Sequence, residues 1–195
     1  MVVPSVAELS SSIDSVKTTV EEKKASFEEK INKIKTKYNT VVGKINSVIY
    51  ELEGYVNKAI NAIVKGIKGA LTWISDKIRA CIRRIEKIID NWNKFIEEKK
   101  KQLEELYNST MDKTKVKLLK TLFTKIGMSV SESEKTADSI KSMVPTPELP
   151  IPKLTIDFPG PFPILESIFN MDFSSFIPGD AKDVKPVDLP KLPMI

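Results

Sequence analysis

Few residues of this chain have the types and spacing that catalysis needs. The 195 residues include no histidine, so the commonest general base and the commonest metal ligand are both absent. The single cysteine, Cys81, can form neither an internal disulfide nor a zinc site built from several thiolates. Glutamates occur in pairs beside lysines, as at Glu97 and Glu98, which is typical of a solvated helix face. We therefore expect no catalytic residues, no metal and no cofactor.

The charged residues between Val56 and Trp92 are mostly cationic. The acids in this stretch are Asp76, Glu86 and Asp90. The candidate contact residues for a membrane or nucleic acid are Lys65, Lys68, Arg79, Arg83 and Arg84. Three interpretations are open for this stretch. It forms the solvated face of a helical bundle, or a membrane-surface helix with tryptophans at the interface, or a phosphate-binding surface for nucleic acid. The first needs nothing further and is favoured, and nucleic acid is the least favoured.

A helix must position these cations, because apolar residues between Val56 and Trp92 recur at steps of three and four. They form one isoleucine-rich stripe, and Cys81 lies beside it as a small buried side chain. Such a stripe has to be covered by a partner helix, another chain or a membrane. We expect homo-oligomerisation through this stripe. The expected interface residues are Ile60, Ile63, Ile67, Ile74, Ile78 and Ile85.

The same periodicity extends upstream and downstream, with heptad spacing from Phe27 to Leu52 that resembles a coiled coil. No proline occurs between Ser5 and Val144, and no strong turn signal occurs before Asn108. We therefore expect one very long amphipathic helix from about residue 6 to 107, within a helical rod of residues 1–107. The alternative is an antiparallel hairpin broken at Gly66 or Gly69.

Residues 108–144 are predicted to form a short helical adaptor. Asn108-Ser109-Thr110 offers an N-cap for a helix from Met111 to Ile126, and Gly127 suits the position after its C-terminus. Ser129 or Ser131, followed by glutamates, resembles a capping box. The box predicts a second short helix that ends near Met143.

Residues 145–195 contain eleven of the twelve prolines and carry more acids than lysines. The segment predicts an extended proline-rich arm, and its apolar residues argue against a disordered linker. We expect it to dock on a neighbouring subunit or another protein, partly as an added strand. The expected anchors are Leu154, Ile156, Phe158, Phe162, Phe169, Phe173 and Phe176.

The sequence thus predicts an all-α protein with one very long coiled-coil-like helix, two short helices and an extended arm. Its expected function is non-enzymatic and structural, as a component of a large assembly. A virion part such as a phage neck, tail, baseplate or minor capsid protein has this general design. The alternative is a membrane-active amphipathic protein that binds or permeabilises a bilayer. We expect a virion or a cytoplasmic assembly as its location, because the first residues lack the pattern of a signal peptide.

Overall fold

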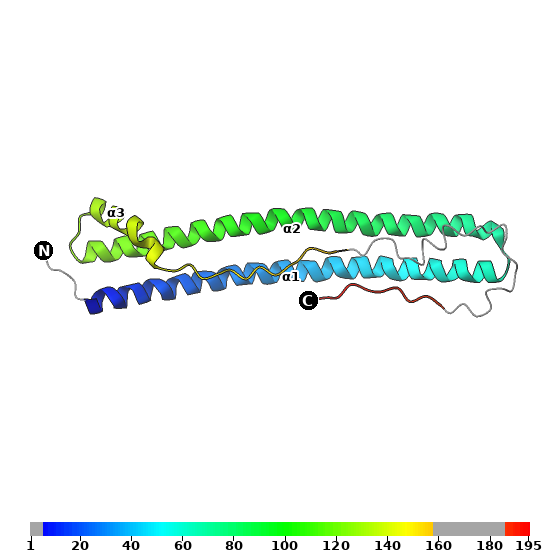
Figure 1. The fold of residues 1–195 in the computed structure, drawn as a ribbon, viewed down its shortest axis with the longest axis horizontal. Coiled ribbons are helices and arrows are strands. Elements are labelled where there is room, and N and C mark those ends of the chain that lie inside the picture. Colours follow the sequence, from blue (N-terminus) through cyan, green and yellow to red (C-terminus); the bar gives the residue numbers. More distant parts are fainter. Residues whose placement is uncertain (1–5, 158–185) are drawn as a thin grey trace. The chain divides into compact units, whose positions relative to one another are not determined.

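The computed structural model describes residues 6–157 and 186–195 of the chain (Figure 1). All regular structure in these residues is helical. The elements are α1 (Val6–Val64), α2 (Lys68–Lys125), α3 (Val130–Ile140) and a short 3-10 turn, η1 (Lys141–Met143). Residues 144–157 and 186–195 have no regular secondary structure. The prediction of an all-α fold is confirmed, but the structure has two long helices where one was expected.

The prediction of an uninterrupted helix from residue 6 to 107 is wrong, because α1 ends at Val64. Gly66 then adopts a positive φ of 67°. The amide of Gly66 donates to the carbonyl of Ile63, and that of Ile67 donates to Ala62. This pair of hydrogen bonds is a Schellman motif, which satisfies the last carbonyls of a helix and suits glycine. The hairpin that the sequence left as an alternative is therefore the one found, and the break lies at Gly66.

The helix break expected at Asn108-Ser109-Thr110 is also wrong, because α2 continues through these residues to Lys125. The apolar spacing does not stop there. Leu103, Tyr107 and Met111 are all buried at successive four-residue steps. Packing of this face outweighs the modest preference of Asn, Ser and Thr for helix ends.

The end of α2 and the start of α3 follow the sequence signals. Gly127 has a φ of 92°, and its amide and that of Met128 donate to Thr124 and Phe123 in a second Schellman motif. Ser129 caps α3 and forms a complete capping box with Glu132. The predicted glycine terminator and the predicted short helix are confirmed.

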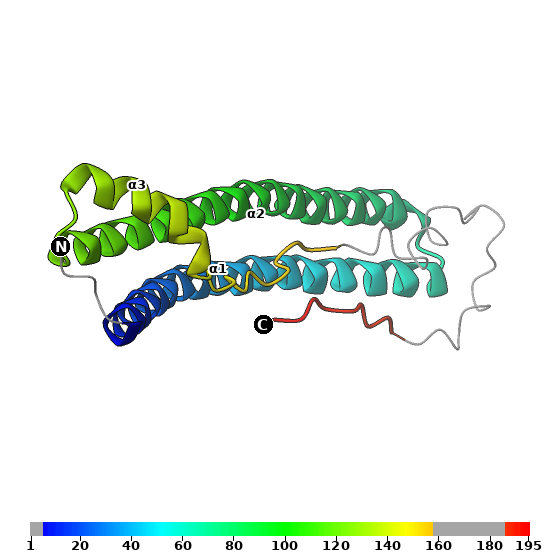
Figure 2. The same ribbon diagram turned by 60° about the vertical axis from the view of Figure 1, so that its left-hand side comes forward.

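The chain divides into two compact units. The turn unit contains residues 35–96 and 154–195, and the α3 unit contains residues 1–34 and 97–153. Within the turn unit, α1 and α2 lie side by side and antiparallel in both views (Figures 1 and 2). The rings of Tyr38 and Trp92 meet edge to face at 6.0 Å in this pairing. Ile45, Leu52 and Ile78 are among its fully buried side chains.

The α3 unit has its own core, formed by α1, α2 and α3. Phe27 and Tyr107 meet edge to face with ring centroids 5.1 Å apart. Ala137 of α3 is fully buried against this cluster. The buried members of the core are Val16, Val20, Phe27, Ile31, Leu103, Tyr107, Met111, Leu119, Phe123, Ala137 and Val144.

Candidate peptide-binding site on the helices

Cys81, the single cysteine, is buried in the hairpin. Cys81 is 2% exposed, and burial raises the pKa of its thiol, with the Glu51 carboxylate as a smaller cause. A raised pKa keeps the thiol protonated and weakly nucleophilic. No group of histidine, cysteine, aspartate and glutamate in the described residues has the arrangement that holds a metal ion.

The isoleucine stripe is covered mostly within one chain. Ile63, Ile74, Ile78 and Ile85 are at most 8% exposed without any second copy. Ile60 is half-buried, and Ile67 is 50% exposed at the α1–α2 turn. The antiparallel hairpin therefore removes the need for a partner to cover the stripe. Oligomerisation stays a prediction, and of these six residues Ile67 offers the most free surface.

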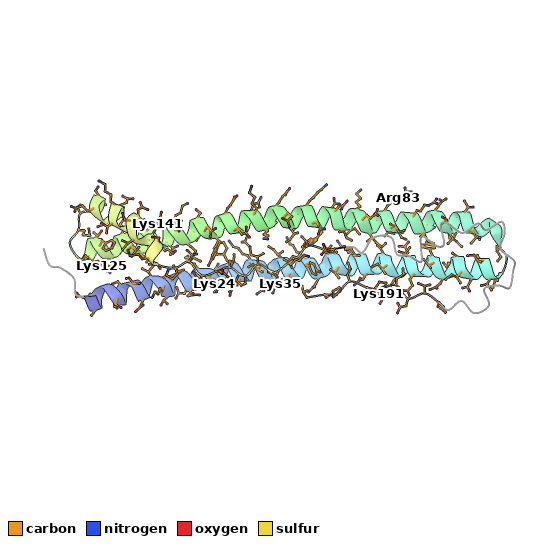
Figure 3. All side chains as sticks on the ribbon, in the orientation of Figure 1. Lys24, Lys35, Arg83, Lys125, Lys141 and Lys191 are labelled. Carbon is orange, nitrogen blue, oxygen red and sulfur yellow. The ribbon has the colours of Figure 1, made fainter. Side chains whose placement is uncertain are left out.

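Four of the five predicted cationic residues lie on the outside of the turn unit. Lys65, Arg79 and Arg83 are exposed, and Figure 3 shows Arg83 pointing away from α1. Arg84 pairs with Glu51 of α1 at 2.8 Å, so it contributes to the hairpin. The side chain of Lys68 lies outside the described residues. Among the described helices, none is both long and apolar enough to cross a membrane.

Residues 154–156 of the arm lie on α2 of the turn unit. Leu154 and Ile156 are each 3% exposed. The indole nitrogen of Trp92 donates to the carbonyl of Leu154 at 2.7 Å. The Asn93 side chain donates to the carbonyl of Ile156 at 2.9 Å and accepts from its amide at 2.9 Å. Two of the predicted anchors therefore dock on the chain's own helix.

Phe158, Phe162, Phe169, Phe173 and Phe176 lie outside the described residues.

Residues 186–195 lie along α1, and the double hydrogen bond of Asn93 recurs there three times. Each asparagine donates from its amide nitrogen to a backbone carbonyl and accepts the backbone amide of the same residue. Asn39 binds Ile195 at 2.6 and 2.9 Å. Asn46 binds Leu192 at 2.9 and 2.8 Å. Asn57 binds Val187 at 3.1 and 2.8 Å.

Glu53 completes this set between Asn46 and Asn57. Its carboxylate accepts the Leu189 amide at 3.1 Å and the Lys191 ammonium at 2.7 Å. Lys191 also pairs with Asp188 at 2.6 Å. Its hydrogen bonds to the carboxylates of Asp188, the larger cause, and Glu53 hold the pKa of Lys191 well above its ordinary value. We call Asn39, Asn46, Glu53 and Asn57 the polar row. Four positions of the extended segment are thus held through their backbone.

The α3 unit holds the start of the arm by a different pair of contacts. The Tyr107 hydroxyl donates to the carbonyl of Pro147 at 2.6 Å, and the Lys115 ammonium donates to the Thr146 hydroxyl at 2.5 Å. Lys115 is only 3% exposed. Burial lowers the pKa of its ammonium, and Asp112 opposes that effect.

The polar row was not among the residues predicted from the sequence. Its signal was nevertheless present, because Asn39, Asn46 and Glu53 recur at heptad spacing beside the apolar stripe. Polar residues at heptad spacing commonly indicate a contact with a specific partner. The extended partner segment has its own repeat of apolar residues and prolines, which was interpreted only as an extended arm.

No protein-family model, curated protein or solved structure matches this chain.

Proposed function

We propose that this chain is a non-enzymatic assembly protein whose helices hold an extended, proline-rich polypeptide. The carrying observation is the double hydrogen bond that four asparagines make with backbone amide groups. A side-chain amide has both a donor and an acceptor, so it can pair with one peptide unit in both directions. This arrangement recognises an extended backbone, as an added strand does at a sheet edge.

In the assembly, we propose that residues 186–195 of one copy lie on α1 of a neighbouring copy. The polar row contacts mainly backbone atoms, so it presents the same hydrogen bonds to this segment from either source. Residues 158–185 separate the two docked parts of the arm. Twenty-eight residues can span at most about 100 Å when fully extended. That reach is enough for the segment to leave its own helix for a neighbour's.

Prolines favour such docking. Pro186, Pro190 and Pro193 restrict the free segment, so less conformational entropy is lost when it is held. A virion remains the predicted setting for this design of long helices with a clamping arm.

Cross-linking of full-length chains tests the exchange between copies. A Cβ at Gly43 would lie 3.7 Å from the Met194 side chain, and these positions are on α1 and in the docked segment. In a Cys81→Ala background, one variant carries Gly43→Cys and another Met194→Cys. After mixing at high concentration, a short thiol cross-linker should join the two chains. The Gly43→Cys/Met194→Cys chain is the positive control for docking within one copy.

A Lys65→Cys variant replaces Gly43→Cys as the control for random collision, because Lys65 directly follows the end of α1, about 30 Å from Gly43 along the helix. The proposal predicts that Gly43→Cys gives far more cross-linked dimer than Lys65→Cys. Efficient cross-linking within the double variant, with no dimer above the Lys65→Cys level at any concentration, would overturn the exchange.

A membrane surface is the second candidate, and one feature of the turn unit favours it. Ile67 and Trp73 are about half exposed near the α1–α2 turn, where Lys65 is also exposed. Lys77 lies over the Trp73 ring at 5.7 Å. Exposed isoleucine and tryptophan with flanking lysines suit the interface of an anionic bilayer.

Co-sedimentation with anionic liposomes tests this second function. Binding that persists in high salt and is lost in an Ile67→Ser/Trp73→Ser variant would support insertion at the turn. Tyr50→Ser is the matched control, because Tyr50 is 61% exposed on α1. Equal sedimentation of all three proteins would contradict insertion at this site.

A further inference from the structure

The spacing of the polar row matches the spacing of the residues that it contacts. Asn39, Asn46 and Glu53 are seven residues apart, which is about 10.5 Å per step along a helix and returns to nearly the same face. Their partners Ile195, Leu192 and Leu189 are three residues apart. Three residues of extended, polyproline-like chain cover about 9–10 Å. Two helix turns therefore advance as far as one triplet of the segment.

The last contact keeps the same register. Asn57 is four residues beyond Glu53, which is about 6 Å along the helix. Its partner Val187 is two residues from Leu189, which is also about 6 Å of extended chain. The agreement extends over four contacts and the nine residues from Val187 to Ile195. A single fortuitous contact would not produce a register shared by four contacts.

No proline of the segment occupies a contacted position, and Pro190 and Pro193 lie between contacts. Each contacted residue donates its backbone amide to the polar row, and proline has no amide hydrogen to donate. Pro186, Pro190 and Pro193 are exposed. Of the contacted residues, Leu189 is 2% exposed and Leu192 is half-buried. The prolines stiffen the segment without removing any hydrogen bond to the helix.

We infer that the polar row is a peptide-binding site for an extended triplet repeat of the form apolar–proline–any residue, in which the apolar residue must have a free amide. The ligand that fits is the segment Leu189-Pro190-Lys191-Leu192-Pro193-Met194-Ile195 of a neighbouring copy. This inference rests on the proposed assembly function and names the ligand chemistry of its site. The polar row supplies the register, and the buried leucine contributes apolar contact.

The position of proline is the variable that tests this rule. Leu192→Pro places proline at a contacted position and removes the amide that Asn46 accepts. Met194→Pro places proline between contacts, at a side chain that is 60% exposed. Leu192→Ala shortens the same side chain as Leu192→Pro but keeps the amide. All three changes lie outside the helices, so far-UV circular dichroism should be unchanged.

Hydrogen exchange of the Leu189 amide reports how firmly the segment is held, and it is measured in dilute full-length protein. We expect exchange at least about tenfold faster in Leu192→Pro, because one hydrogen bond is lost and the Asn46 oxygen loses its partner. Met194→Pro should exchange within about threefold of the parent, and Leu192→Ala should fall between the two. Equal acceleration by Leu192→Pro and Met194→Pro would overturn the triplet rule.

This measurement is independent of the cross-linking test, because exchange in dilute protein reports the segment on its own helix. If the three variants show the expected order of exchange rates but no cross-linked dimer forms, the site is supported and assembly through it is refuted. If the cross-linked dimer forms but the exchange rates do not follow that order, the assembly is supported and the triplet rule is refuted.

Discussion

Replacement of Ile78 by alanine tests whether the apolar stripe is closed within one chain. Ile78 is 0% exposed on α2 of the turn unit, although no second copy is present. Deletion of a fully buried isoleucine side chain to Cβ typically lowers the free energy of unfolding by about 2–5 kcal/mol. For a side chain with no exposure, we expect about 3–4 kcal/mol. Ile67→Ala is the matched control, and its 50% exposure reduces the expected loss to about 1 kcal/mol or less.

Urea unfolding, followed by far-UV circular dichroism, measures both losses. The parent and the two variants are unfolded at protein concentrations about 100-fold apart. If α1 and α2 cover the stripe within one chain, the midpoint of unfolding is the same at both concentrations. If a dimer covers it, the higher concentration adds about 2.7 kcal/mol of apparent stability. With a urea dependence of about 1–3 kcal/mol per M, the midpoint then moves by about 1–3 M.

Two results would refute this reasoning. A loss below about 1 kcal/mol for Ile78→Ala would show that the side chain is not in a packed core. A midpoint that rises with concentration in the parent but not in Ile78→Ala would assign the stripe to an interface between copies. The first result would contradict the hairpin packing, and the second would restore the oligomer predicted from the sequence.

Three further changes have expected outcomes in the same unfolding assay. Gly66→Ala should lower the free energy of unfolding by about 1–2 kcal/mol, because φ is 67° there. Gly69 lies in open space within α2, so Gly69→Ala should raise that free energy by up to about 1 kcal/mol. Equal effects of the two changes would refute the turn. Trp92→Phe should cost about 1–3 kcal/mol and speed exchange across 154–156, because the Leu154 carbonyl loses its donor; unchanged exchange would contradict the docking. Lys115→Met should be more stable than the parent at neutral pH, since the parent buries a charge. That advantage should shrink as pH rises through the lowered folded pKa of Lys115 toward its higher unfolded pKa, and a constant advantage would refute this account.

The helices and their buried faces were predictable because they depend on local periodicity. The spacing that placed Ile74, Ile78 and Ile85 on one face identified residues that are buried in the structure. The capping box at Ser129 and Glu132 was equally local, since it involves residues only three apart. Such signals do not depend on which other part of the chain covers the face.

The chain reversal was harder to predict because its signal competes with helix continuity. Gly66 and Gly69 are equally unfavourable inside a helix, and only the first is followed directly by an isoleucine that can close a Schellman motif. At Asn108 the error was the opposite one, because a cap signal was given more weight than the buried spacing around it. Both decisions depend on the free energy of tertiary packing, which the local sequence does not contain.

The polar row suggests how the same contacts can serve a single copy and an assembly. Side-chain amides released by the segment exchange their protein hydrogen bonds for bonds to water, so each bond has a small net free energy. Movement of the segment from its own α1 to a neighbour's forms the same bonds again and therefore changes the bonding free energy little. The balance then depends on concentration, because the attached segment has an effective concentration of order mM at its own helix. We expect dilute chains to hold their own segment and to exchange it only where neighbouring copies approach that local concentration, as they do in an assembling structure.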